Sequence, residues 1–156
     1  MESLTIRKYP DKLLRKQCKP IEEITEKEIE LFQDMLFTMK HFAGIGLAAP
    51  QVGIAKKMIV AEVDNRIIKL ANPQIVGMRG NDSMAEGCLS VPDVIVDIKR
   101  PDEVIVQGLD DKGNIVEIRM EGLLARVVQH EIDHLNGRLI IDYMNMAEKL
   151  KYQLIK

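Results

Sequence analysis

The 156-residue sequence lacks the features that direct a chain to a membrane or to a polyanion. It has no apolar run long enough to span a bilayer, and its first twenty residues lack the apolar stretch of a signal peptide. Lysine and arginine (22) nearly balance aspartate and glutamate (24), with no basic cluster of the kind that binds nucleic acid. We therefore expect a cytoplasmic protein with neither a DNA nor a membrane partner.

Cysteine is also scarce, since the chain has only Cys18 and Cys88. Two cysteines can form at most one disulfide, and a cytoplasmic protein normally keeps both as thiols, which leaves thiolate chemistry open. No internal repeat or low-complexity tract is visible, and the length is typical of one domain with a substantial core. We predict a single domain over residues 1–156.

The hydrophobic pattern predicts two helices on either side of a β-rich middle. Apolar residues recur at helical spacing over 25–43, where Thr25 and Glu28 form a capping-box pair. A second helix is predicted over 122–137, ending at Asn136 and Gly137. Short β-branched runs predict strands at 56–63, 66–72, 73–78 and 93–100, and then a hairpin of 102–109 and 114–120.

The remaining segments complete the predicted architecture. The Gly- and polar-rich stretch 77–87 is expected to be a loop, and the charged segment 146–156 a short terminal helix. We therefore predict an α+β fold, in which mostly antiparallel, curved sheets pack around a central helix formed by 122–137.

The segment 44–53, GIGLAAPQVG, fits the spacing G-x-G-x-x-A of dinucleotide-binding turns. That fingerprint needs a strand before the glycines and a helix after them, so that the helix N-terminus faces the pyrophosphate. Here a predicted helix precedes the glycines, and Pro50 disfavours a helix start after them. The pattern therefore does not predict a nucleotide site, and the loop needs another role.

His130, Glu131 and His134 form the pattern H-E-x-x-H on the second predicted helix. Two histidines four residues apart lie on one helix face, where both imidazoles can bind one metal ion with Glu131 beside them as a proton acceptor. A helical wheel places Glu131 on the apolar face, where an unpaired carboxylate is costly and a metal-bound water would compensate it. The alternative is that both histidines are ordinary core or surface residues and Glu131 bonds to backbone.

Two histidines need a third ligand, and the sequence offers few. The extended motif of the metzincin proteases would place a third histidine where Ile140 stands. Asp142 and Glu148 lie too close to the helix for the distant glutamate of thermolysin-like proteases. Cys88 in the segment EGCLSVP remains, and a thiolate with two imidazoles leaves the fourth position open for water. A lone cysteine is more often a small core residue, so that alternative stays open.

The chain resembles the peptide deformylases on three motifs. They read GIGLAAPQ at 44–51, EGCLS at 86–90 and QHEIDH at 129–134. The match extends to YPDKLLRKQCKPIEE near the start and GLLARVVQHEIDHLNGRLIIDYM near the end, so it covers nearly the whole chain. The resemblance implies a metal-dependent hydrolase that removes the formyl group from the N-formylmethionine of newly made bacterial polypeptides and releases formate.

Carried over residue by residue, the resemblance implies a metal site and three catalytic groups. Glu131 would be the general base and acid, while Gln51 through its side-chain amide and Leu89 through its backbone N–H would hold the oxyanion. One Fe²⁺ is the implied cofactor, with Zn²⁺ or Ni²⁺ often found in its place. The implied metal ligands are Cys88, His130 and His134.

The resemblance also implies residues that bind the peptide. The loop with Ile45 and Gly46 would contact the substrate, and Gly87 would bring the backbone of its segment close to it. Arg100 ends the next predicted strand, where the family often has a basic residue beside the peptide backbone. The expected partners are N-formylmethionyl nascent peptides, and we expect a monomer in a bacterial cytoplasm. Transient ribosome association stays open, because the tail after Tyr143 is short.

Three neighbouring residues have two interpretations each. Leu47 and Val127 would line a methionine pocket with Ile45, or would be packed in the core. Arg126, one helical turn before the first histidine, would pair with Glu86 or another carboxylate, or would be a solvated charge.

Two other functions would use the same residues. A general metallopeptidase would apply the same water to peptide bonds, but usually with His or Glu as the third ligand. A non-catalytic, metal-stabilised binding domain would need a fourth protein ligand, for which His41 is the one remaining histidine. Cys88 favours the deformylase over the first alternative, and Glu131 would be a needless buried charge in the second.

Overall fold

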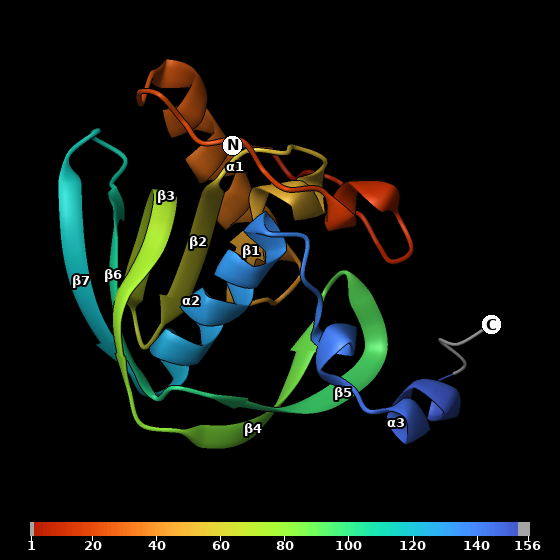
Figure 1. The fold of residues 1–156 in the computed structure, drawn as a ribbon. Helices are drawn as coiled ribbons and strands as arrows, with labels where there is room; N and C mark the ends of the chain where they lie inside the picture. The colour runs from red at the N-terminus through yellow and green to blue at the C-terminus, as the bar shows by residue number, and fades with distance from the viewer. Residues whose placement is uncertain (1, 153–156) are drawn as a thin grey trace.

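The computed structural model describes residues 2–152 and consists of three helices, three short 3₁₀ helices and seven strands in two sheets (Figure 1). The helices are α1 (Glu26–His41), α2 (Gly122–Leu135) and α3 (Met146–Lys151), and the 3₁₀ helices are η1 (Lys12–Arg15), η2 (Ala49–Val52) and η3 (Ile140–Tyr143). The strands are β1 (Gly46–Ala48), β2 (Met58–Val63), β3 (Arg66–Arg79), β4 (Asp82–Cys88), β5 (Val91–Arg100), β6 (Glu103–Leu109) and β7 (Ile115–Glu121).

The larger sheet has the strand order β1-β2-β3-β6-β7, with every neighbouring pair antiparallel. Successive side chains of a strand point to opposite sides, and in strand β2 both sides are buried. Its residues Ile59 and Ala61 pack in the core cluster that contains the apolar residues of α2. Met58 and Val60 pack in a second cluster, with side chains of α1. The two helices therefore cover opposite faces of this sheet.

Helix α2 lies between the larger sheet and the β4–β5 hairpin (Figure 1). Its apolar side chains Leu124, Val128 and Leu135 are buried against the larger sheet. The predicted fold, antiparallel sheets around the helix that carries the H-E-x-x-H motif, is thus the one observed. Gly137 follows the helix with φ 73°, the left-handed conformation expected of a glycine beyond a helix end.

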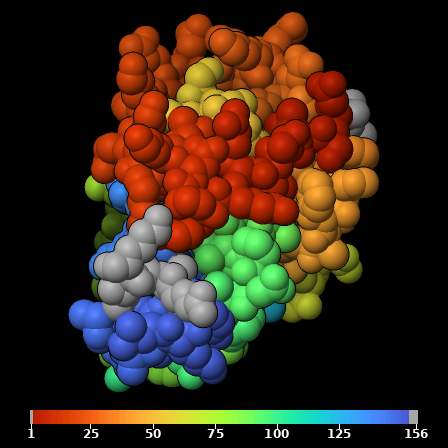
Figure 2. Space-filling model, turned by 90° about the vertical axis from the view of Figure 1, so that its right-hand side faces the viewer, coloured from red at the N-terminus to blue at the C-terminus, as the bar shows by residue number. Residues whose placement is uncertain are grey.

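The face of the β4–β5 hairpin that meets α2 also packs against the segments that come before α1 and after α2, whereas its other face is exposed. Val94, Val96 and Ile98 of β5 alternate with exposed residues and pack against η3 and against Leu14 of η1. The backbone N–H of Tyr9 donates to the carbonyl of Ser90 at 2.8 Å. Figure 2 shows the N-terminal segment lying against this part of the chain.

Two predictions about the middle of the chain were wrong. Residues 66–72 and 73–78 form one strand, β3, which passes Pro73 through a register shift between Ala71 and Gln74. A bulge tolerates proline because the ladder hydrogen bond is already interrupted there. The expected loop 77–87 contains the end of β3 and nearly all of β4, joined at Gly80 and Asn81. Most side chains of β4 are exposed, so its sequence carries no hydrophobic alternation.

Smaller differences occur at the ends of elements. The short strand β1 was not predicted, and η2 begins at Ala49 although Pro50 was expected to prevent a helical start. Proline is tolerated in a first helical turn, where its missing N–H has no partner to bond. The predicted terminal helix is observed as α3, and residues 153–156 lie outside the described part of the chain. Within residues 2–152, no helix is both long and apolar enough to cross a membrane.

The start of α1 generates a prediction about acid stability. The Glu28 carboxylate accepts hydrogen bonds from the hydroxyl and the backbone N–H of Thr25, and it pairs with Lys56 at 3.4 Å. The Thr25 hydroxyl, then the backbone and Lys56, outweigh burial and lower the pKa of Glu28 to about 2. Glu28→Gln should lower the free energy of unfolding at pH 7 by about 1 kcal/mol.

The pH dependence of that difference follows from the lowered pKa. A carboxylate whose pKa falls on folding stabilises the protein above its unfolded pKa, here 4.5, and loses this effect as the pH falls through about 2. Urea unfolding at several pH values should show the gap between wild type and Glu28→Gln closing over that window. The exposed Glu26→Gln on the same helix turn is the matched control. A gap that stays constant down to pH 2 would contradict the prediction.

Candidate metal centre

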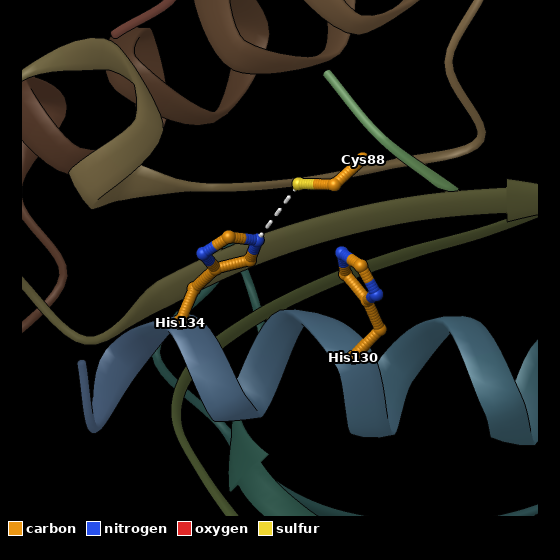
Figure 3. Close-up of side chains that lie close together, drawn as sticks. All are labelled: Cys88, His130 and His134. Carbon is orange, nitrogen blue, oxygen red and sulfur yellow. Dashed lines mark hydrogen bonds between the residues drawn. The ribbon is translucent and has the colours of Figure 1, made fainter. Parts of the chain in front are cut away.

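One side chain from β4 and two from α2 come close together. Cys88 is the last residue of β4, while His130 and His134 lie one turn apart on α2. The Cys88 sulfur lies 3.4 Å from Nε2 of His134, and the three ligand atoms lie within 4.8 Å of one another (Figure 3). Within residues 2–152 this is the one such group of His, Cys, Asp or Glu atoms. The structure therefore brings together the three predicted metal ligands.

The two imidazoles differ in the surroundings that suit them to bind a metal. Nδ1 of His130 lies 2.9 Å from the Glu86 carboxylate, which can only accept, so Nδ1 carries a proton, and Nε2 is the atom that would bind a metal on losing any proton there. Burial, reinforced by the positive charge of His130, holds the pKa of His134 well below its usual value. His134 is therefore neutral, as a metal ligand must be.

The carboxylate of Glu131 is buried without a complete set of partners. Its Oε1 atom has no hydrogen-bond partner among the described residues, and only 4% of the residue is exposed. Burial raises the pKa of Glu131 to about 7, although the nearby charge of His130 lowers it. A buried, unpaired oxygen beside one thiolate and two imidazoles fits a site built for a metal ion and a polar ligand such as water.

The loop at 44–51 reaches this carboxylate through Gly46. A Cβ atom at position 46 would lie 2.4 Å from Oε2 of Glu131 and 2.6 Å from Val127. No side chain fits there, so the backbone of the loop can approach the site only at a glycine. Gly46 and Ile45 both line the cavity beside the three ligands, as the prediction of a substrate loop requires.

Gln51 is held with its amide nitrogen toward the site. Its Oε1 accepts a hydrogen bond from the backbone N–H of Ala48 at 2.9 Å. Its Nε2 donates to the hydroxyl of Ser90 at 3.1 Å and to the Cys88 sulfur at 3.6 Å. Sequence reasoning gave Ser90 no role, although its place two residues after the predicted ligand was the available signal. Leu89, between them, lies in the tight turn that joins β4 and β5.

A cavity of about 470 Å³ opens beside these groups. Apart from the site itself, its walls are largely apolar, and Ile45, Met84 and Leu123 present half-exposed side chains at its rim. Val127 also lines it, whereas Leu47 is fully buried in the core beside α1. Neither Met84 nor Leu123 was predicted to line the cavity: Met84 lies on β4, which was taken for a loop, and Leu123 lies in the first turn of α2. Predicted site residues that line the cavity are Ile45, Gly46, Gln51, Gly87, Cys88, Leu89, His130 and Glu131.

Arg100 requires a correction. Its side chain is buried and does not line the cavity, and its guanidinium bonds both oxygens of Glu86, at 2.6 and 3.0 Å. A third contact, at 2.9 Å, joins it to Asp133, which also accepts from the Tyr143 hydroxyl. This position does not support contact with a peptide. Burial raises the pKa of Glu86, but hydrogen bonds from His130 and Arg100 outweigh it and lower that pKa to about 2.

His41 is not a fourth ligand in this arrangement. It is exposed at the end of α1, with its ring stacked on Phe37 at 6.3 Å and edge-on to Phe42 at 5.0 Å between centroids. Three protein ligands, a buried carboxylate next to them and an adjoining cavity are the parts of a catalytic rather than a closed structural metal site. The fold and the site thus define a metal-dependent hydrolase.

Comparison with known proteins narrows this class to one family. The family model described as polypeptide deformylase matches residues 3–150. A peptide deformylase of Halothermothrix orenii is 49% identical over 91% of this chain and 94% of its own, and one of Thermodesulfovibrio yellowstonii is 47% identical over 96% and 93%. The chain belongs to the polypeptide deformylase family. The three sequence motifs predicted this family.

Solved structures agree with this assignment. The crystal structure of a peptide deformylase from Legionella pneumophila superposes with a TM-score of 0.93 at 39% identity, covering 97% of this chain and 92% of that one. A peptide deformylase from Synechococcus elongatus in complex with actinonin gives a TM-score of 0.91 at 38% identity, covering 97% and 84%. The similarity thus extends over the sheets, α2 and the site between them.

The contact between Gly46 and Glu131 can be tested by adding one methyl group. Gly46→Ala should lower the free energy of unfolding by about 1 to 3 kcal/mol, because the new Cβ displaces a buried carboxylate and overpacks its surroundings. Gly77→Ala is the control, since its Cβ would meet only the flexible end of Ile105 at 3.2 Å. Equal losses in urea unfolding of the two variants would show that Gly46 has no special contact.

Proposed function

We propose that this chain hydrolyses the formyl amide of N-formylmethionyl peptides at the centre formed by Cys88, His130 and His134, with Glu131 moving the proton. The observation that carries this proposal is the orphaned carboxylate oxygen of Glu131, buried beside three metal-ligand atoms. A purely structural site would gain nothing from such a charge, whereas hydrolysis needs a proton acceptor there.

The metal ligands would be the thiolate of Cys88 and the Nε2 atoms of His130 and His134. When bound, the ion acts as a Lewis acid, making a water molecule acidic and polarising the carbonyl. We propose Fe²⁺ as the native ion on the strength of the resemblance. Zn²⁺ and Ni²⁺ are also suited to a thiolate with two imidazoles.

Glu131 would serve first as a base and then as an acid. Burial raises its pKa to about 7 without the ion, and the charge of a bound cation would lower that pKa and favour the carboxylate that accepts a proton. Glu131 takes a proton from water as the water oxygen attacks the formyl carbon. It then gives the proton to the amide nitrogen as the C–N bond breaks. The products are formate and a peptide with a free amino terminus, and Glu131 is regenerated.

Gln51 and Leu89 would stabilise the negative charge on the formyl oxygen. The amide of Gln51 is already oriented, because Ala48 holds its oxygen and only its NH₂ group faces Cys88. The backbone N–H of Leu89, next to Cys88 in the turn, would be the second donor. Donors fixed before the reaction stabilise such a charge without reorganising, which is the basis of an oxyanion hole.

The methionine side chain would occupy the apolar part of the cavity. Ile45, Met84, Leu123 and Val127 surround space suited to a flexible thioether, and none of them carries a charge. The backbones at Gly46 and Gly87 would flank the peptide on opposite walls. Arg100, by contrast, is proposed to support Glu86 and not to touch the substrate.

The proposed setting of the reaction rests on the relatives. We propose that residues 1–156 act as one catalytic domain and as a monomer in a bacterial cytoplasm, on nascent polypeptides. Its relatives in Halothermothrix orenii and Thermodesulfovibrio yellowstonii are bacterial and of nearly the same length. Transient ribosome association stays a prediction.

Removing the proposed base should abolish turnover and leave the metal in place. Glu131→Gln should lower the rate of formate release from an N-formylmethionyl dipeptide by about 10² to 10⁴, the usual contribution of acid–base catalysis. Metal content, measured on the same sample, should equal that of wild type. Glu103→Gln, which removes a surface carboxylate paired with Arg79, is the control. Wild-type turnover by the metal-loaded Glu131→Gln protein would refute the proposed role.

The oxyanion donors can be tested by their separate effects on kcat and KM. Gln51→Ala should lower kcat by about 10² to 10³ with little change in KM, because the donor acts on charge that develops during the reaction. Ser90→Ala should cause a smaller loss of kcat, since Ala48 still holds the other end of the Gln51 amide. A rise in KM alone would indicate that both residues only bind the substrate.

A further inference from the structure

The proposed reaction leaves one buried cation of α2 without a role. Arg126 lies one turn before His130 and is 5% exposed. Its Nη1 donates to Oε2 of Glu86 at 2.6 Å and to the carbonyl of Ile98 at 2.9 Å, and its Nη2 donates to the carbonyl of Asp82 at 2.6 Å. All three acceptors belong to the β4–β5 hairpin. One side chain of α2 is therefore bound to both strands of that hairpin.

This placement matters because the metal ligands are divided between the same two elements. Cys88 ends β4, two residues after Glu86, whereas both histidines are on α2. The separation between the thiolate and the imidazoles therefore depends on how the hairpin is held against the helix. Arg126 binds the hairpin to α2 close to the three metal ligands. Arg100, at the end of β5, makes a second contact between the hairpin and α2, with Asp133.

Glu86 connects this contact with one ligand directly. Its Oε2 receives Arg126 and Arg100, and its Oε1 receives Arg100 and Nδ1 of His130. Loss of Arg126 removes one of the two bonds that Glu86 receives from α2, and the carboxylate that orients the His130 ring would gain freedom. Partners one shell away from a metal usually affect its affinity through such orientation.

Net stability does not explain a buried arginine at this place. The desolvation cost of a buried ion pair largely cancels its attraction, and an apolar side chain of similar volume often stabilises a protein as well or better. The guanidinium fork, with three bonded acceptors, instead fixes geometry, which lysine cannot do with a single ammonium group.

We infer that Arg126 is a positioning residue of the metal centre: it fixes the β4–β5 hairpin on α2 and, through Glu86, the imidazole of His130. The inference rests on the proposed metal site. It assigns Arg126 no contact with the metal or with the reacting atoms. Its effect should therefore appear in the affinity for metal even when no substrate is present.

The test measures the affinity for Co²⁺ alone, by competition with a chelator and the absorption band of a thiolate bound to cobalt. Arg126→Met, which keeps a stem of similar length, should raise the Kd for Co²⁺ by about 10- to 100-fold, the usual effect of losing a residue that orients a ligand. Arg126→Lys should fall between this variant and wild type. Arg79→Met, which removes an exposed arginine paired with Glu103, is the control and should bind as wild type does.

A double-mutant cycle with Glu86→Gln tests whether Arg126 acts on His130 through Glu86. Because Arg126 acts on His130 through Glu86 and on the hairpin through the Ile98 and Asp82 carbonyls, the double variant Arg126→Met/Glu86→Gln should lose less affinity for Co²⁺ than the two single losses combined, and fully additive losses would overturn the inference. A Kd for Arg126→Met within about twofold of wild type, with a lower unfolding midpoint of the metal-free protein, would overturn it in favour of a merely structural role.

Three outcomes separate the inference from the proposed metal site and from a failure to fold. If Arg126→Met does not fold, Arg126→Lys takes its place, and wild-type affinity in that variant would overturn the inference. Failure of wild type to bind Co²⁺ would overturn the proposed metal site together with the inference. Tight binding by wild type and Arg126→Met alike would overturn the inference only.

Discussion

The buried carboxylate of Glu86 joins the two halves of this molecule at the place where the chemistry occurs. It belongs to a hairpin whose own core faces the N-terminal segment and η3, and it meets a helix whose core faces the larger sheet. The two apolar clusters do not by themselves determine how the hairpin and helix are placed. Arg100, Arg126 and His130 converge on Glu86 and supply that placement through charge-assisted hydrogen bonds, which are short and directional.

Local patterns in the sequence were sufficient for the parts of the structure that are governed by one element. The histidine spacing on α2, the capping pair of α1 and the glycine beyond α2 each depend on helical geometry alone. Strand β4 depends on pairing with β5 and carries mostly exposed side chains without hydrophobic alternation, so no local pattern reveals it. The cavity wall formed by Met84 could not be predicted for the same reason.

The roles of individual residues divide in the same way, into those that the local sequence indicates and those that depend on the assembled fold. Cys88 was proposed from its chemistry and from the absence of other ligands, and the fold places it with both histidines. The resemblance placed Arg100 beside the peptide backbone, whereas the partners of Arg100 in the fold, Glu86 and Asp133, come from two different elements. The orientation of Gln51 likewise depends on Ser90, which lies 39 residues away in the sequence, in the turn between β4 and β5. Such contacts between distant segments are set by the assembled fold, and sequence spacing does not contain them.

The division of the ligands between a hairpin and a helix has a consequence for the whole chain. Cys88 and His134 are 46 residues apart in the sequence, so an ion held by both closes a long loop, much as a cross-link would. Any ligand that binds only the folded form adds its binding free energy to folding. The ion would therefore serve two purposes, in that its supply in the cell would govern both how many molecules are active and how long each one survives proteolysis.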